Sequence, residues 1–319
     1  MTLDTATETR LPQAKIRAGL VAALKAARDY EGATAPNPPV GCALLDASGA
    51  IITFAAHHGA GQLHAEALAI KQAREMGRAN DIHTVVVTLE PCNHHVRTPP
   101  CTEAILSTPA RSVVIGARDP NPHVEGGGAV RLAQTGLDVF FNEDATFRRL
   151  IGPFAKVMTG GMPWVTVKQA FTRDGSMIPP PGHKTFTTQA SLALAHDLRR
   201  RADAIITGSG TILADNPHFT VRHVADFPDK RRKLLIFDRR RRVPDSYLRA
   251  AEARGFEIEF HHVLGEALRS VVAGGGLEVL VEAGPALSAH VLASPHWDEQ
   301  LRITQTEDGD KLTHVLRHH

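Results

Sequence analysis

The residues of this chain best suited to chemistry are one histidine and two cysteines, each placed near a predicted element boundary. His64 stands at the start of a predicted helix, and Cys92 and Cys101 follow it, each directly after a proline. One imidazole and two thiolates supply three zinc ligands and leave the fourth tetrahedral position open to water. An open position predicts catalysis, because zinc lowers the pKa of its bound water to about 7.

Glu66 supplies the second part of this chemistry. It stands two residues after His64 on the first helical turn, close to the metal but outside its ligand set. A carboxylate in that place can carry protons from the water to a leaving amine. Together with the two Pro-Cys pairs, His64-Ala65-Glu66 forms the pattern of zinc deaminases that act on nucleobases. Each ligand alone would be interpreted as a core residue, but the three together predict a metal site.

We predict other roles for the remaining cysteine and for two histidines close to these ligands. Cys42 lies in an apolar run without a partner motif, and we expect it in the core. His94 and His95 stand between the two ligand cysteines, and we expect them to line the loop or the substrate. Three cysteines in 319 residues do not form a disulfide framework. They fit the reducing cytoplasm.

Composition excludes several classes of protein. The chain is 43% hydrophobic and 22% charged, as an ordinary globular protein is, and its length predicts two domains. The formal net charge of +2 gives no bulk attraction to nucleic acid. The polar N-terminus lacks the apolar region of a secretory signal, and no apolar run approaches the roughly 18–20 residues that span a bilayer. We therefore expect no nucleic-acid partner and no membrane partner.

The elements that must position these residues alternate between helix and strand. Periodicity predicts a helix over 15–30, a hairpin of strands over 40–45 and 51–55, and a closing helix over 143–158. Between them it predicts helices over 64–76, 101–106 and 128–134, and strands over 83–89, 112–117 and 137–141. Residues 159–163 contain two glycines and a proline and form the predicted linker. A second α/β unit follows, with a helix over 189–201 and strands over 164–171, 204–207, 234–237, 256–260 and 277–281.

The motifs around the ligands resemble the deaminase half of the bifunctional riboflavin-biosynthesis deaminase/reductase. The similar segments are Asn37-Pro38-Pro39-Val40-Gly41, His64-Ala65-Glu66, residues 88–101 and residues 119–124. The resemblance implies a cytidine-deaminase-like three-layer α/β/α domain over 1–158. It also implies a dihydrofolate-reductase-like α/β domain over 164–319, shortened at its C-terminus. Zn²⁺ and NADPH are the implied cofactors, and a phosphoribosylated pyrimidine is the implied substrate.

The reductase half is similar to that family through shorter pieces, among them residues 202–211, 215–217, 220–222 and 281–285. The resemblance implies cofactor contacts at Ala170, Thr185, Thr211, Asp215, Arg239 and Gly284. It implies substrate contacts at Asn37 in the deaminase half and at His183, Arg199, Phe219, Arg222 and Glu282 in the reductase half. Arg199 and Arg222 would hold the ribose phosphate, because guanidinium groups bind phosphate through two charged donors.

Several positions depart from the family pattern. Asn93 and Val96 replace the usual Ser and Gly in the loop between the ligand cysteines. His183 and Thr185 replace Ser and Trp, so a residue that stacks near the nicotinamide is absent. After Ala289 the sequence is polar and hard to align, and we expect the last strands of the reductase sheet to be reduced or absent.

A basic run over 230–242 holds eight basic residues in thirteen. It is interpreted as a solvated rim at both ends of one strand, as a site for the 2′-phosphate of NADPH, or as an RNA contact.

Three functions remain open at this point. The first is the two-step enzyme: zinc-dependent deamination of the diaminopyrimidine, then reduction of its ribosyl chain to ribityl by NADPH. The second is a deaminase with a non-catalytic scaffold domain, and the third is a nucleic-acid deaminase with a binding domain. The sequence leaves the homo-oligomeric state open.

Overall fold

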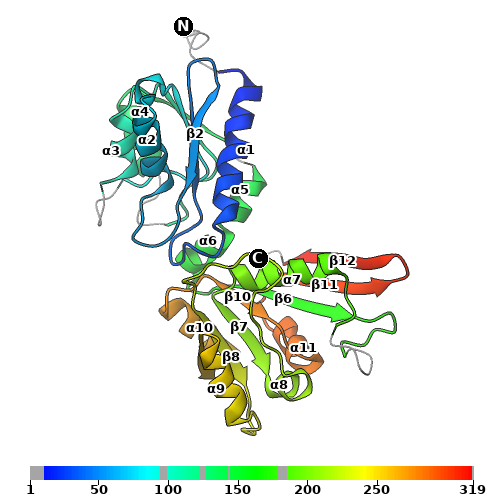
Figure 1. Ribbon diagram of the computed structural model, residues 1–319. Coiled ribbons are helices and arrows are strands. Elements are labelled where there is room, and N and C mark those ends of the chain that lie inside the picture. Colours follow the sequence, from blue (N-terminus) through cyan, green and yellow to red (C-terminus); the bar gives the residue numbers. More distant parts are fainter. Residues whose placement is uncertain (1–10, 94–98, 122–126, 143, 179–184, 318–319) are drawn as a thin grey trace. The chain divides into compact units, whose positions relative to one another are not determined.

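The computed structural model describes residues 11–93, 99–121, 127–142, 144–178 and 185–317. The chain divides into two compact units, Met1–Thr159 and Gly160–His319, each with its own sheet (Figure 1). Helix α6 (Gly152–Gly160) includes the first two residues of the predicted 159–163 linker, so those two are helical. Gly161 follows with a φ of 63°, the left-handed conformation that ends a helix.

The N-terminal unit contains a five-stranded sheet in the order β2-β1-β3-β4-β5. Its strands are β1 (Gly41–Leu45), β2 (Ile51–Ala56), β3 (Thr84–Val87), β4 (Ser112–Ile115) and β5 (Asp138–Phe141). β1 pairs antiparallel with β2 and β3, whereas β3, β4 and β5 run parallel. The predicted hairpin and the predicted parallel strands are therefore confirmed.

Helices cover both faces of this sheet. They are α1 (Gln13–Asp29), α2 (Ala65–Glu75), α3 (Cys101–Leu106), α4 (Gly127–Gln134), α5 (Ala145–Leu150) and α6, with a 3₁₀ turn at Ala79–Asp81. Cys42 and Leu44 pack in the cluster with residues of α2 to α4, whereas Ala43 and Leu45 pack in the cluster with α1. Figure 1 shows α1 on one side of β2 and α2 to α4 on the other. The alternation of side chains along β1 thus builds the three layers, and Cys42 is a core residue with no exposed surface.

The closing helix predicted over 143–158 is two helices. α5 ends at Leu150, and α6 begins at Gly152. Pro153 explains the break, because its ring lacks an N–H donor and clashes with a preceding helical turn. Proline is nevertheless well suited to the first turn of a new helix. Glu143 lies outside the described residues.

The second unit contains a seven-stranded sheet in the order β12-β11-β6-β10-β7-β8-β9. Its strands are β6 (Trp164–Phe171), β7 (Ala204–Gly208), β8 (Arg232–Phe237), β9 (Phe256–Phe260), β10 (Glu278–Val281), β11 (Glu299–Thr306) and β12 (Gly309–Leu316). Its helices are α7 (Gln189–Arg201), α8 (Ser209–Asp215), α9 (Asp245–Ala253), α10 (Leu264–Ala273) and α11 (Pro285–Ala293). Every neighbouring pair is parallel except β11 and β12.

The expectation that the last strands are reduced or absent is wrong. β11 and β12 are eight residues each and form a hairpin that joins the sheet through β6. β12 is the edge strand, and most of its side chains are exposed. An edge strand in water has no need of apolar alternation, which is why this polar segment did not look like a strand.

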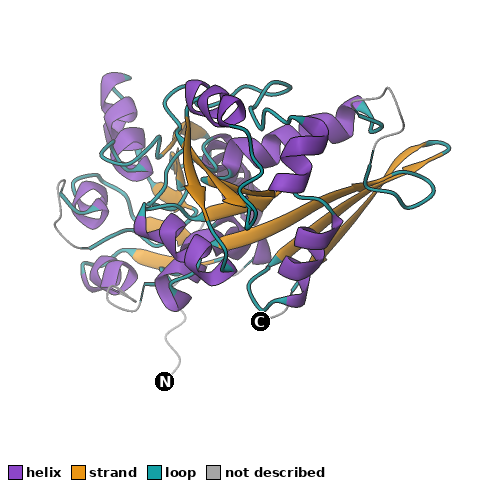
Figure 2. Ribbon diagram, turned by 90° about the horizontal axis from the view of Figure 1, so that it is seen from below, coloured by secondary structure: helices purple, strands orange, loops and turns teal. Residues whose placement is uncertain are grey.

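Both faces of the second sheet are covered. Ile205, Leu234 and Ile236 pack in the cluster with α9, and Ile206, Val279 and Val281 pack in the cluster with α10 and α11. Figure 2 shows strands flanked by helices, and a pair of long strands that extends beyond the helices. None of the described helices is long and apolar enough to span a membrane.

Candidate functional site

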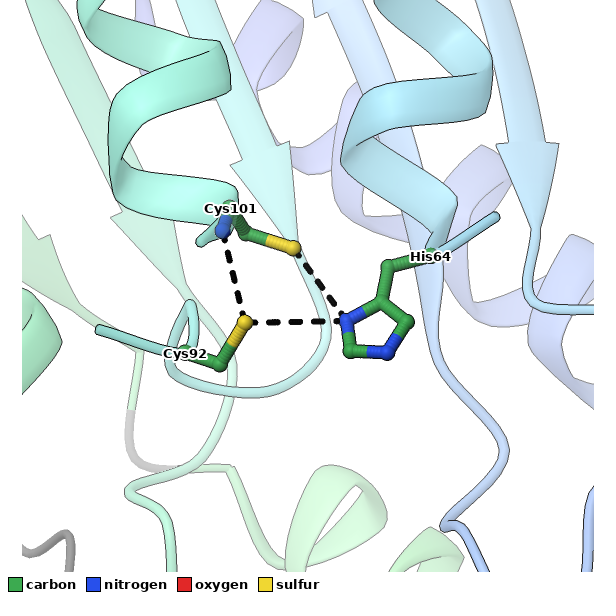
Figure 3. A group of neighbouring side chains, drawn as sticks. All are labelled: His64, Cys92 and Cys101. Atoms are coloured by element: carbon green, nitrogen blue, oxygen red, sulfur yellow. Dashed lines mark hydrogen bonds between the residues drawn. The ribbon is translucent and has the colours of Figure 1, made fainter. Parts of the chain in front are cut away.

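The three predicted zinc ligands converge on one point (Figure 3). Nδ1 of His64 lies 3.6 Å from Sγ of Cys92 and 3.3 Å from Sγ of Cys101, and all three ligand atoms lie within 4.8 Å of one another. Zinc bonds of about 2.3 Å to sulfur and 2.0 Å to nitrogen at the tetrahedral angle place S and N about 3.5 Å apart. The distances therefore fit one tetrahedral ion.

Three element boundaries hold these ligands. His64 is the residue before α2, Cys101 is the first residue of α3, and Cys92 lies on the loop after β3. The backbone N–H of Cys101 donates to Sγ of Cys92 at 3.3 Å, so the start of α3 fixes the second thiolate. A hydrogen bond with the Cys101 side chain lowers the pKa of Cys92 to about 4. The same contact, together with burial, raises the pKa of Cys101.

Glu90, two residues before Cys92, fixes the start of the Cys92 loop through hydrogen bonds from two backbone N–H groups. Its buried carboxylate accepts from the backbone N–H of Ala129 at 3.0 Å and of Asp119 at 3.3 Å. A Cβ on Gly128 would lie 1.9 Å from the carbonyl oxygen of Pro91, so the loop rests directly on the backbone of α4. We did not predict a role for Glu90 from the sequence, although it stands two residues before a ligand.

Glu66 is the second residue of α2 and is 3% exposed. Its burial, and then the charge of Cys92, raise the pKa of its carboxyl group. A carboxyl group with a raised pKa is better able to hold and release a proton near neutral pH. Its location beside the three ligands is what the sequence predicted.

Asn37 and His57 form a network behind His64. The Nδ2 group of Asn37 donates to Nε2 of His57 at 3.0 Å, and Nδ1 of His57 donates to the carbonyl of Leu63 at 3.0 Å. The His57 ring packs edge-on against His64, with centroids 5.2 Å apart. Burial lowers the pKa of His57, which favours the neutral ring that these bonds require. The sequence reasoning missed His57, although it indicated Asn37.

Asn93, which stands where the family usually has serine, has a hydrogen-bond partner in the structure. Its Oδ1 accepts from the hydroxyl of Thr102 on α3 at 2.9 Å, so this residue ties the ligand loop to the helix that carries Cys101. His94, His95 and Val96 lie outside the described residues.

The second unit contains a cleft of about 1440 Å³. Nine of the predicted contacts line it: Ala170, Thr185, Arg199, Thr211, Asp215, Phe219, Arg222, Glu282 and Gly284. Arg239 is exposed and is not among the described lining residues, whereas Arg242 is. His183 lies outside the described residues.

Glu282 is the most heavily paired group in this cleft. Its Oε2 accepts from Nε of Arg199 at 2.6 Å, and its Oε1 accepts from Nη2 of Arg199 at 3.1 Å and lies 3.0 Å from Nζ of Lys168. Burial alone would raise the pKa of this carboxyl group, but Arg199 and Lys168 lower it to about 2. The sequence indicated Arg199 and Glu282 separately, but neither their ion pair nor Lys168.

A hydrogen bond and two residues with an unusual backbone conformation also shape the cleft. Oγ1 of Thr211 accepts from the backbone N–H of Gly284 at 2.8 Å and so joins α8 to the start of α11. Asn216 and Phe219 have φ angles of 42° and 56°, a left-handed backbone that is rare for residues other than glycine. Burial raises the pKa of Asp215.

The basic run is divided between two roles. Lys230, Arg232 and Lys233 form ion pairs with Asp203 (2.9 Å), Asp226 (2.5 Å) and Glu259 (2.6 Å). These three residues are therefore structural rather than a solvated rim. Nη2 of Arg242 donates to Oγ of Ser209 at 3.0 Å, where both residues line the cleft.

Comparison with known proteins gives matches to both units. Residues 14–117 match the family described as the cytidine and deoxycytidylate deaminase zinc-binding region, and residues 163–304 match the RibD C-terminal domain. The riboflavin biosynthesis protein RibD of Corynebacterium ammoniagenes is 34% identical over 86% of this chain and 81% of its own. RibD of Aquifex aeolicus is 39% identical over 70% of this chain, a match that spans 61% of the relative's length.

Solved structures agree with these matches. Acinetobacter baumannii RibD superposes with a TM-score of 0.78 at 31% identity, over 92% of this chain and 87% of the other. The Thermotoga maritima diaminohydroxyphosphoribosylaminopyrimidine deaminase/5-amino-6-(5-phosphoribosylamino)uracil reductase superposes with a TM-score of 0.77 at 28% identity, again over 92% and 87%. The predicted fold class, a cytidine-deaminase-like domain followed by a reductase domain, is confirmed.

Proposed function

Because this chain belongs to the RibD family of riboflavin-biosynthesis deaminases/reductases, we propose that it performs two consecutive reactions on one phosphoribosylated pyrimidine. Residues 1–158 would remove an amine from the diaminopyrimidinone by hydrolysis, and residues 164–319 would reduce the ribosyl chain to ribityl. The observation that carries the proposal is the convergence of His64, Cys92 and Cys101 beside the buried Glu66.

In the first reaction His64, Cys92 and Cys101 would hold the zinc ion. When bound, zinc supplies a water that ionises near neutral pH. Glu66 would carry a proton from the attacking water to the amine nitrogen of the pyrimidine, so that a C–O bond forms, the C–N bond breaks and ammonia leaves. Asn37 has its NH₂ group committed to His57, which leaves its side-chain oxygen to accept a hydrogen bond from the pyrimidine.

In the second reaction Thr211, Asp215, Gly284 and Arg242 would border the NADPH, in a cleft that can enclose both cofactor and substrate. When bound, NADPH supplies the hydride that reduces C1′ of the ribose. Glu282 presents a carboxylate fixed on both sides by cations, and its Oε2, which accepts one bond from Arg199, keeps a lone pair for a ribose hydroxyl. Thr185 lines the cleft where a stacking Trp is usual, so we expect a raised KM for NADPH.

The two rival functions are less well supported. A scaffold domain needs no large cleft, nor a carboxylate held between two cations at its wall. Three of the eight basic residues in the run that could attract RNA form ion pairs within the protein. Three cysteines, two of them in one candidate metal site, fit a reducing compartment, and we place the protein in the cytoplasm.

One experiment tests the proposal directly. The purified protein is incubated with the diaminopyrimidine phosphate, with and without NADPH, and the products are identified by mass. We expect deaminated product without NADPH and its ribityl derivative when NADPH is added. Deamination alone under both conditions would favour the scaffold function, and turnover of RNA instead of the free nucleotide would favour the nucleic-acid deaminase.

A further inference from the structure

His196 is a buried histidine in the reductase cleft to which the proposed mechanism assigns no role. It lies on α7, three residues before Arg199, and is 2% exposed. It lines the cleft together with Arg199, Arg222 and His223. The His223 ring packs edge-on against it, with centroids 4.6 Å apart.

The hydrogen bonds of His196 determine which ring nitrogen carries the proton. The backbone N–H of Arg222 donates to Nδ1 of His196 at 2.8 Å, so Nδ1 is an acceptor and carries no hydrogen. Burial, followed by the charges of Arg199, His223 and Arg222, lowers the pKa of His196 to about 4, against a small opposite effect of Glu282. The ring is therefore neutral at physiological pH, and its single hydrogen is on Nε2.

Nε2 of His196 faces another donor. It lies 3.4 Å from Nη1 of Arg199, and a guanidinium group has no acceptor. The other hydrogen bonds that the side chain of Arg199 forms with described residues are the two to Glu282 and one from Nη1 to the carbonyl of Thr220 at 3.3 Å. Two donors side by side at the wall of a cleft are satisfied together by one acceptor oxygen of a ligand.

The neighbouring charge indicates that this acceptor is anionic. Nη1 of Arg222 donates to the neutral hydroxyl of Thr220 at 2.9 Å, and no carboxylate among the described residues forms an ion pair with this guanidinium group. A phosphate group has several anionic acceptor oxygens and can receive bonds from Arg199, Arg222 and an imidazole N–H at once.

We propose that Nε2–H of His196 donates a hydrogen bond to the 5-phosphate of the substrate and makes this site specific for the phosphorylated ribose. This inference rests on the proposed function, because it deepens the assignment of the reductase substrate. His196 has a double role, since its Nδ1 also holds the backbone that carries Arg222.

Two substitutions of His196 can test the roles of its two ring nitrogens separately. In His196→Asn the side-chain oxygen can replace Nδ1 as the acceptor for Arg222, but the Nε2 donor is lost. In His196→Gln the amide nitrogen reaches the position of Nε2, but the Nδ1 acceptor is lost. Binding of ribose 5-phosphate and of inorganic phosphate is measured by calorimetry on the full-length protein. We expect His196→Asn to weaken the binding of both probes about 10- to 100-fold, and His196→Gln, which keeps the donor but loses the acceptor for Arg222, to weaken it less than His196→Asn does.

Kinetics give a second readout. For reduction, His196→Asn should raise KM for the phosphorylated substrate and leave kcat and the KM for its dephosphorylated form nearly unchanged. If His196 only held the Arg222 backbone, His196→Asn would behave as the wild type and His196→Gln would be impaired, which overturns the inference. NMR of the unaltered protein avoids any folding defect: ribose 5-phosphate should shift the Nε2 resonance of His196, and an unmoved resonance overturns the inference.

The inference and the proposed function can fail separately. Phosphate affinity that depends on His196 in a protein that reduces nothing would overturn the proposed reduction and support the anion site. Equal phosphate affinity in all three proteins, together with normal reduction, would overturn the role of His196 alone.

Discussion

Replacement of Arg199 by alanine tests the energetic picture of the reductase cleft. Arg199 makes two hydrogen bonds to Glu282, at 2.6 and 3.1 Å, and both partners are largely buried. Removing one partner of a buried ion pair costs about 3–5 kcal/mol, because the other charge is left without compensation. In the variant, Lys168 remains 3.0 Å from Glu282 and compensates part of its charge. We therefore expect the free energy of unfolding to fall by about 3 kcal/mol, the lower end of that range.

The chain is well suited to measuring this loss. Its two tryptophans, Trp164 and Trp297, both lie in the second unit, so tryptophan fluorescence during urea unfolding reports on that unit alone. Arg222→Ala is the matched control. Arg222 is exposed and its Nη1 donates to a hydroxyl, so we expect a change in the free energy of unfolding within about 0.5 kcal/mol.

The pH dependence of stability gives an independent check of the ion pair between Arg199 and Glu282. The pKa of Glu282 lies at about 2 in the folded protein against 4.5 for an unperturbed group. The stability that this depression contributes is therefore complete above pH 4.5 and is lost as the pH falls from there toward 2. In Arg199→Ala the slope of stability against pH across this window should be smaller. A loss below about 1 kcal/mol at neutral pH, with the slope unchanged, would refute the argument.

The remaining predictions concern the two cofactors. Cys92→Ser should lower the zinc content from one ion per chain, measured by metal analysis, because serine is a poor zinc ligand; full occupancy would exclude Cys92 as a ligand. Glu66→Gln should keep its zinc and lose deamination by about 10²–10⁴-fold, since an amide cannot transfer the proton; near-normal turnover would point to another proton carrier. Arg242→Ala should weaken NADPH more than NADH in a fluorescence titration, whereas Arg239→Ala, outside the cleft, should not; equal effects of the two variants would argue against Arg242 as a phosphate contact.

The sequence by itself determined the metal site and the order of the elements. His64, Cys92 and Cys101 each stand at the edge of a short, well-patterned element, so their types and spacing were enough to predict the group that the structure brings together. Strand alternation and helical periodicity are local properties, and the three-layer N-terminal unit follows from them. The break between α5 and α6 was readable from Pro153 but was overlooked.

Tertiary structure alone decided the partners of the charged groups. Arg199 and Glu282 are 83 residues apart, and only the pairing of β10 between β6 and β7 brings Glu282 to the helix that carries Arg199. The donor role of His196 depends on one backbone N–H of a distant loop. β11 became recognisable only through its register with β6, and β12 through its register with β11, because an exposed edge strand carries little hydrophobic pattern. Hydrogen-bond partners and register are set by packing between distant segments, and a local pattern does not contain that information.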